Sequence, residues 1–385
     1  MRLSSLLFLI TCLLGSLNAR AQPSTHFIDT CADPNDETLF ANSACYVDPS
    51  YEPGKKIGKA AGYNPPMCIQ GASLSDSEKG ILKAAHKLAP DYMKARLCGL
   101  TFHDCDANGK NCFQLFVIRN SSTPSASWGF WEANDLCGSG GCTTPQGRKQ
   151  AIGLGVFIAI SESLLNGGIS SIVDLENKLA GQLLRATGNP RALQFFKSPT
   201  TMPELATLDA LAHELGHVLL ADTDADGFFM DHPRNVLRGV TGPGNDCFGS
   251  KLLNASWSKT EFINTKPLRA ERWIDFAKNK GDTRTKNQFD WSAYGNVTNG
   301  EYTKVIDKIS KLYARKDFVS LWAALRPEED FVETYKYKVL IDKMPVPLTV
   351  NFGGADIDVL DFIRNSPAQD LKNKLQCLND LGLTR

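Results

Sequence analysis

A predicted helix at residues 208–221 constrains this chain more than any other part of its sequence. Thr201 lies three residues before Glu204, with Pro203 between them, which is typical of a helix start. A run rich in aspartate at 222–227 ends the segment. Apolar side chains recur at helical spacing between these limits, at Leu208, Leu211, Ala212, Leu215 and Leu219. The pattern predicts a well-bounded amphipathic helix, and its middle reads His213-Glu214-Leu215-Gly216-His217.

The two histidines of this helix are spaced to share a metal ion. Residues four apart lie on one face of a helix, one turn apart, so His213 and His217 can both bind one Zn²⁺ at about 2.0–2.1 Å. Glu214 follows His213 directly and can take a proton from water held at such a metal. The chain has only 6 histidines. Two of them at ligand spacing around a glutamate favour a zinc site over a buried helix with incidental histidines.

The first 21 residues have the pattern of a secretory signal peptide. Arg2 precedes a mostly apolar run at 3–14, and Ala19-Arg20-Ala21 is a small-x-small cleavage site. The run is too short to span a bilayer, and no later segment has a transmembrane pattern. We therefore expect a secreted or periplasmic protein without a membrane span. Basic and acidic side chains number 42 each, which gives no sign of a nucleic-acid surface.

The cysteines are expected to form disulfide bonds. The chain has 11 of them, and an even number remains if Cys12 leaves with the signal peptide. An even number in an exported chain is typical of a disulfide framework. Two pairs are local, and the other three complete one set that the spacing allows, although the sequence alone does not fix the connectivity. The set is Cys105–Cys112, Cys137–Cys142, Cys31–Cys45, Cys68–Cys98 and Cys247–Cys377.

The order of the predicted elements favours an α+β fold. A capping box at Ser75–Glu78 opens a helix that runs to about residue 88. Strands are expected at 113–119, 127–131, 151–161 and 345–352, and further helices at 173–186, 191–196, 268–278, 302–314, 317–324, 328–339 and 367–381. Residues 75–227 would form a lobe with a small twisted sheet and the histidine helix, and 228–385 a mostly helical lobe. Residues 22–74 would be a disulfide-rich leader or, alternatively, a removable propeptide.

A catalytic zinc site needs a third protein ligand and one open position. The metzincin signature requires glycine three residues and histidine six residues after the second histidine, but Leu220 and Thr223 stand there, so that class is excluded. The segment 326–335 is the better source of the ligand, because Pro327 starts a helix whose first turn is acidic. Glu329 and Glu333 share one face of that helix. Either carboxylate could bind the metal, with the other supporting it.

His-Glu-x-x-His followed by a helix that reads Glu-Asp-Phe-Val-Glu, 329–333, resembles the gluzincin metallopeptidases, in particular the lethal-factor-type zinc endopeptidases. The resemblance covers these two motifs only. It implies a zincin-like two-lobed fold, with His213, His217 and Glu333 as zinc ligands and Glu214 as the general base. Arg326 stands where the lethal-factor type has a catalytic tyrosine, so Glu329 or Tyr335 is expected to assist at the site. Alternatives for the oxyanion role are Tyr337, His232 and Arg326.

A second ion is suggested by the acidic run after the histidine helix. Residues 222–227 read Asp-Thr-Asp-Ala-Asp-Gly, which matches the first half of an EF-hand loop. Pro233 occupies the position of the usual final glutamate, so the loop is not an intact EF-hand. Asp222, Asp224 and Asp226 would repel the negative end of the helix, and Ca²⁺ would relieve that repulsion. A solvated acidic turn is the alternative.

These observations together predict an exported zinc-dependent endopeptidase that acts on a protein or peptide substrate. Two alternatives stay open at this point: a zinc-holding binding or adhesion module without turnover, and a zinc amidohydrolase acting on a non-protein amide. Glu214 favours an enzyme, because a site that only holds a metal needs no base. The sequence gives no indication of cleavage specificity or oligomeric state.

Overall fold

The computed structural model describes residues 33–47, 68–69, 71–101, 114–119, 127–130, 156–183, 196–197, 201–223, 318–320, 322–323, 327–351 and 356–384. Several sequence-based predictions lie outside these residues. They include the signal peptide at 1–21, the helices at 268–278 and 302–314, the local cysteine pairs, Cys247 of the predicted pair Cys247–Cys377, and the aspartates Asp224 and Asp226.

A four-stranded mixed sheet forms the first half of the fold. Its strands are β1 (Ala44–Val47), β2 (Gln114–Ile118), β4 (Val156–Ser161) and β3 (Ser127–Phe130), in that order across the sheet. The first three are parallel, and β3 pairs antiparallel with β4 at one edge. The predicted strands at 113–119, 127–131 and 151–161 are thus confirmed in the residues that the structure describes.

The strands are apolar on both faces because both faces are covered. Leu115, Val117, Ile158 and Ile160 pack into the main core, whereas Phe116, Ile118 and Ala159 face a smaller cluster. Helices α2 (Glu37–Asn42), α3 (Asp76–Leu88) and α4 (Asp91–Thr101) contribute to the main core. The capping box predicted for α3 is present, since the Ser75 hydroxyl accepts from the Glu78 N–H and Glu78 accepts from the Ser75 N–H.

The leader segment, 22–74, supplies strand β1 of this sheet and contains a disulfide bond that differs from the expected pairs. Cys45 is bonded to Cys68, with a Cα–Cα distance of 5.5 Å. The Ile69 N–H donates to the Tyr46 carbonyl, and Val47 pairs with Cys68 in an antiparallel bridge, so Cys68 lies beside β1. The predictions Cys31–Cys45 and Cys68–Cys98 are therefore wrong. Cys98 and Cys377 are also disulfide-bonded.

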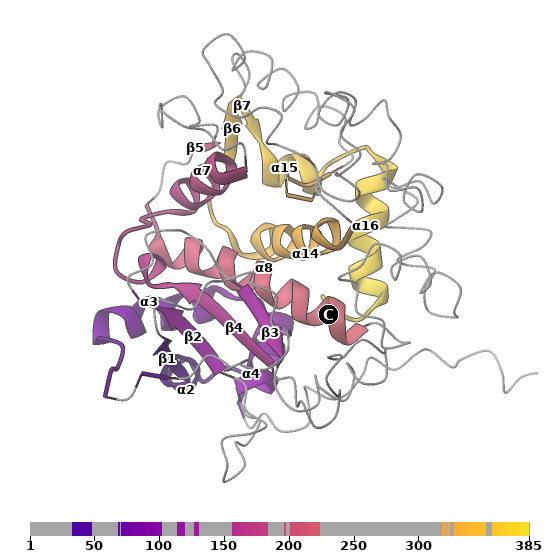
Figure 1. Cartoon of the computed structure of the whole chain (residues 1–385). Helices are drawn as coiled ribbons and strands as arrows, with labels where there is room; N and C mark the ends of the chain where they lie inside the picture. The colour runs from indigo at the N-terminus through magenta and orange to yellow at the C-terminus, as the bar shows by residue number, and fades with distance from the viewer. Residues whose placement is uncertain are drawn as a thin grey trace, which may run out of the picture.

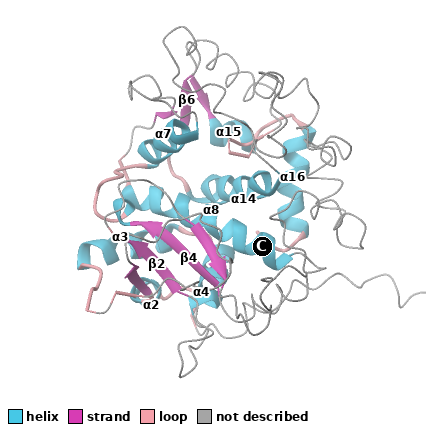
Figure 2. Cartoon of the chain, viewed as in Figure 1, coloured by secondary structure: helices cyan, strands magenta, loops and turns pink. Residues whose placement is uncertain are grey.

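The second half of the fold is centred on two helices, α8 (Pro203–Thr223) and α14 (Pro327–Lys343). Helix α8 lies between the four-stranded sheet and α14 (Figure 1). A three-stranded antiparallel sheet, with β6 (Thr349–Asn351) between β5 (Phe196–Lys197) and β7 (Asp356–Asp358), forms a separate group of strands (Figure 2). Around them are α7 (Ile172–Leu183), α15 (Val359–Arg364), α16 (Gln369–Asp380) and a 3₁₀ turn at Glu162–Leu164.

Most of the predicted helices in the described residues are present, but two predictions need correction. Phe196 was expected to end a helix and instead starts strand β5. The helix expected at 317–324 is also wrong, since 319–320 form a bend, 322–323 form a turn, and Phe318 is not helical. There the Ser320 hydroxyl accepts from the Ala323 N–H and donates to Glu333, which gives this segment a turn anchored on α14. The fold is α+β, and none of its described helices is long and apolar enough to cross a bilayer.

Candidate metal centre

The candidate site lies where α8 and α14 face each other, and a glycine sets their approach. Gly216 has no side chain, and a Cβ added there would lie 3.1 Å from Val332 Cγ1, 3.2 Å from Val332 Cα and 3.3 Å from its carbonyl oxygen. The two backbones therefore meet closely between His213 and His217 on one helix and between Glu329 and Glu333 on the other. This contact fixes how far the histidines lie from the carboxylates.

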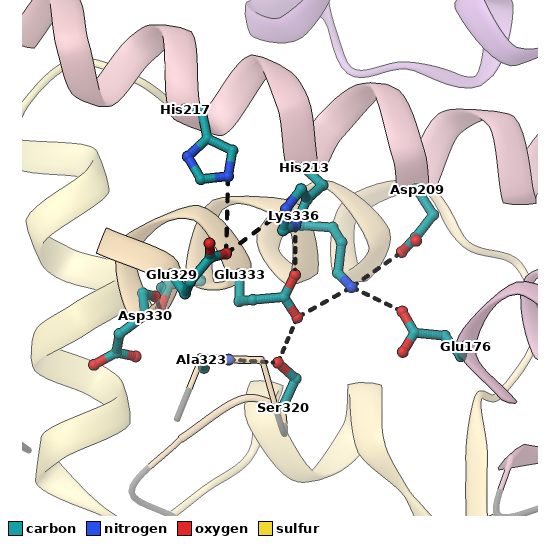
Figure 3. Close-up of polar contacts among 11 residues, drawn as sticks. Glu176, Asp209, His213, His217, Ser320, Ala323, Glu329, Asp330, Glu333 and Lys336 are labelled. Carbon is teal, nitrogen blue, oxygen red and sulfur yellow. Dashed lines mark hydrogen bonds and ion pairs between the residues drawn. The ribbon is translucent and has the colours of Figure 1, made fainter. Parts of the chain in front are cut away.

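His213, His217 and Glu329 form a group that could hold a metal ion. One ligand atom from each lies within 4.8 Å of the other two. The Glu329 Oε2 atom is 3.7 Å from His213 Nε2 and 3.8 Å from His217 Nε2 (Figure 3). Tetrahedral zinc with bonds of about 2.0–2.1 Å places its ligand atoms roughly 3.4 Å apart. Two imidazoles and a carboxylate at these distances therefore fit Zn²⁺ with only small side-chain movements.

Glu333 occupies a different place from the one that the resemblance implies. Its Oε1 atom lies 2.7 Å from His213 Nδ1, on the opposite side of the ring from Nε2. Its Oε2 atom accepts from the Ser320 hydroxyl and lies 3.1 Å from Lys336 Nζ. The side chain is fully buried. The geometry thus favours the alternative in which Glu329 is the third ligand and Glu333 orients His213.

Glu214 is buried next to this group, with 5% of its surface exposed. Burial raises the pKa of its carboxyl group, the His213 charge lowers it, and Glu329 and Glu333 raise it further, to about 7. A carboxyl group with a pKa near neutrality can both accept and donate a proton in the physiological range. This is the property that a general base next to a metal needs.

A buried cation, Lys336, lies on the far side of Glu333 from the histidines. Its Nζ atom is 2.7 Å from Glu176 Oε1 on α7 and 3.6 Å from Asp209 Oδ1 on α8. Burial alone would lower its pKa, but Asp209, Glu176 and Glu333 raise the pKa well above its ordinary value. Lys336 is therefore charged and ion-paired in the interior.

The same charges set the protonation of the groups around them. Burial would raise the pKa of Glu333, but Lys336 and the hydrogen bond with His213 lower it to about 2. Burial would lower the pKa of His213, but the hydrogen bond to Glu333, together with Glu214, Glu333 and Glu329, raises it to about 9. Burial also raises the pKa of Asp209, to about 8. Because metal ligands must be deprotonated, zinc binding here would release a proton from His213.

Of the other predicted helpers, Tyr335 is not brought to the site. Tyr335 is two residues beyond Glu333 and so points to another side of α14, where its ring meets Tyr92 edge-on at 6.3 Å. The Tyr337 ring lies 4.8 Å from Lys336 Nζ. Arg326 and His232 lie outside the described residues. The calcium prediction is likewise untested. Asp222 belongs to α8, but the placement of its side chain is not described, and Asp224 and Asp226 lie outside the described residues.

Sequence reasoning missed the supporting residues of the site, although a weak signal exists for two of them. Asp209 lies four residues before His213, so both are on one face of α8. Lys336 lies three residues after Glu333, which is the spacing of a helical ion pair. Nothing local connects Glu176 or Ser320 to the motifs, since they come from separate segments that only the fold brings together.

The close approach at Gly216 predicts that Gly216→Ala lowers stability. A new methyl group would force α8 and α14 apart by a few tenths of an ångström, which costs about 1–3 kcal/mol and outweighs the roughly 0.5–1 kcal/mol that alanine gains in a helix. We expect a lower free energy of unfolding in urea and weaker zinc binding. The control is Gly80→Ala on α3, where a Cβ meets nothing within 4 Å. That variant should gain stability, and an equal gain in Gly216→Ala would contradict the close-contact argument.

Comparisons with known proteins add no further assignment: no family model matches the chain, and neither a curated protein nor a solved structure matches it.

Proposed function

We propose that this chain is an exported zinc-dependent hydrolase that cleaves peptide bonds, built as a two-lobed, zincin-like metallopeptidase. One observation carries the proposal: His213 Nε2, His217 Nε2 and Glu329 Oε2 converge between two facing helices, with the buried Glu214 beside them. Two imidazoles and one carboxylate are a donor set that catalytic zinc uses. Export is supported by the signal-peptide pattern at 1–21 and by the disulfide bond between Cys45 and Cys68.

Each residue of the site has a role in the proposed reaction. His213, His217 and Glu329 would hold the zinc ion, whose Lewis acidity polarises a carbonyl group and lowers the pKa of water. Glu333 accepts from His213 Nδ1 and keeps Nε2 of that ring directed at Glu329. Glu214 takes the proton that water loses as it attacks the peptide carbonyl carbon. It then passes this proton to the leaving amine, so that the base is restored at the end of the cycle.

The proposal predicts that removal of the metal stops cleavage and that zinc restores it. The mature chain would be incubated with a proteome-derived peptide library, and new termini would be identified by mass spectrometry. We expect cleavage at a consistent set of sites, its loss after dialysis against a chelator, and its recovery on addition of about one equivalent of Zn²⁺. Recovery with Ca²⁺ or Mg²⁺ alone would contradict a zinc site.

The same experiment separates an enzyme from a zinc-holding module. A chain that binds one equivalent of Zn²⁺ tightly and yields no new termini in the library, in folded proteins or in amide-containing non-protein compounds would have no hydrolytic function. Cleavage confined to the non-protein amides would move the proposal to an amidohydrolase. Peptide cleavage that persists in the chelated protein would exclude the metal mechanism altogether.

A further inference from the structure

Lys336 joins three buried acids from three helices, which is an unusual arrangement for a lysine. Its side chain is 1% exposed, and its Nζ atom lies 2.7, 3.6 and 3.1 Å from carboxylate oxygens of Glu176 of α7, Asp209 of α8 and Glu333 of α14. Figure 3 shows the ammonium group between these carboxylates. A buried ion pair contributes little to net stability, because desolvation offsets its attraction. The arrangement therefore calls for a reason other than stability.

Glu333 connects this cation to the candidate metal centre. One carboxylate oxygen contacts His213 Nδ1 at 2.7 Å, and the other receives Lys336 and the Ser320 hydroxyl. Both oxygens are thus fixed, so the plane of the carboxylate is fixed as well. A carboxylate held in this way sets both the tautomer and the orientation of the imidazole that it contacts. Among the described residues, the charged groups that contact Glu333 are His213 and Lys336.

We propose that Lys336 is a positioning residue of the metal site, which acts through Glu333 to hold the His213 ring with Nε2 directed toward Glu329 and His217. This inference rests on the proposed function, since it assigns Lys336 to the same metal centre. Glu176 and Asp209 hold Lys336 from two other helices, so the orientation of His213 depends on α7, α8 and α14 together. Loss of the Lys336 charge leaves Glu333 buried without its main counter-ion, and the carboxylate is no longer held in its orientation. His213 then loses its fixed acceptor.

A second buried lysine provides a matched control. Lys374 of α16 lies 2.7 Å from Asp330 on α14, and both side chains are fully buried. Its Nζ atom also lies 4.4 Å from the centre of the Phe318 ring. Asp330 points away from the histidines in Figure 3. Both Lys374→Met and Lys336→Met thus remove the lysine from a buried ion pair with an acid of α14. Only Lys336 is paired with the acid that contacts His213.

The test compares zinc affinity in the full mature chain carrying Lys336→Met or Lys374→Met. Affinity would be measured by competition with a chromophoric chelator, on protein whose far-ultraviolet circular dichroism matches that of the unsubstituted chain. We expect Lys336→Met to bind Zn²⁺ about 10–100-fold more weakly, which is the usual effect of losing a partner that orients a ligand. Lys374→Met should stay within about threefold of the unsubstituted chain. With Co²⁺ at saturation, only Lys336→Met should change the visible absorption bands. Equal affinities and equal spectra in the two variants would overturn the inference.

A double-mutant cycle tests whether Lys336 acts through Glu333, and it also decides the matter if Lys336→Met does not fold alone. The double variant Lys336→Met with Glu333→Gln removes both charges of this ion pair, so that Glu333 is not left as a buried, unpaired carboxylate. It should bind Zn²⁺ as Glu333→Gln does, within about threefold. A further tenfold loss in the double variant would overturn the proposed path.

The outcome for the unsubstituted chain distinguishes this inference from the proposed function. If that chain binds Zn²⁺ but cleaves nothing, the proposed activity fails, and the effect of Lys336 on zinc affinity still decides the inference. If it binds and cleaves, but Lys336→Met and Lys374→Met behave alike, only the inference fails. If it binds no Zn²⁺, both are wrong.

Discussion

Glu214→Gln is expected to abolish hydrolysis while zinc stays bound. Glutamine has the size and shape of glutamate, so it fits the buried position, where 5% of the residue's surface is exposed. It cannot accept a proton from water, and the loss of a general base slows a reaction by roughly 10²–10⁴-fold. Glu214 is not among the residues whose ligand atoms converge on the site, so zinc content should not change. The measurement is kcat/KM on a peptide cleaved by the unsubstituted chain, together with zinc content by atomic spectroscopy.

A matched substitution on the same helix controls for nonspecific effects. Glu204 lies in the first turn of α8, away from the histidines, so Glu204→Gln makes the same chemical change outside the site. That variant should retain kcat/KM within about twofold. If Glu214→Gln turned over substrate at the same rate with full zinc occupancy, Glu214 would not be the base, and the proposed mechanism would be wrong.

The parts of the fold that the sequence predicts well are those with strong local signals. Helix α3 begins where its capping box indicates, and α8 and α14 follow from proline starts and from apolar spacing. Strands β2 and β4 are short runs of apolar and β-branched residues, which the composition reveals directly. In each case the deciding interactions lie within one segment of the chain.

Long-range pairing accounts for the errors. Strand β1 has no distinctive pattern, and it exists because Ala44–Val47 pairs with a strand about seventy residues later along the chain. The bond between Cys45 and Cys68 depends on the same packing, which brings residue 68 alongside β1. Ser320 lies in a turn because its hydroxyl is used by Glu333 and by the Ala323 N–H. Apart from Ala323, these partners lie too far along the chain for a window of local sequence to contain them.

The candidate site likewise has one part that local spacing predicts and another that depends on long-range packing. His213 and His217 share a face because they are four residues apart on one helix, and that is a local property. Glu329 and Glu333 also share a face, so spacing cannot decide which of them meets the histidines. The decision depends on how α14 is placed along α8, and the contact between Gly216 and Val332 fixes that placement. The support given by Lys336, Glu176 and Asp209 likewise appears only when three helices are assembled.

Zinc affinity should therefore fall much further in Glu329→Gln than in Glu333→Gln. An amide is a poor zinc ligand, and a binding free energy of about 10–16 kcal/mol shared among a few ligands means that losing one costs roughly 4 kcal/mol, or about a thousandfold. Glu333 contacts His213 Nδ1 and not the converging ligand atoms, so its loss should cost about 10–100-fold. The measurement is zinc competition with a chromophoric chelator, at one pH, for both variants.

The ranking of these two variants decides between the two assignments of the third ligand. In the arrangement that the resemblance implies, Glu333 binds zinc and Glu329 supports the site, so the larger loss would fall on Glu333→Gln. In the arrangement that the geometry favours, Glu329 Oε2 lies within 3.8 Å of both histidine Nε2 atoms, and the larger loss falls on Glu329→Gln. Because both substitutions remove one charge from one face of α14 and keep the side-chain volume, a difference of tenfold or more reflects the ligand itself. The reverse order would mean that α14 shifts by about one turn along α8 when the metal binds.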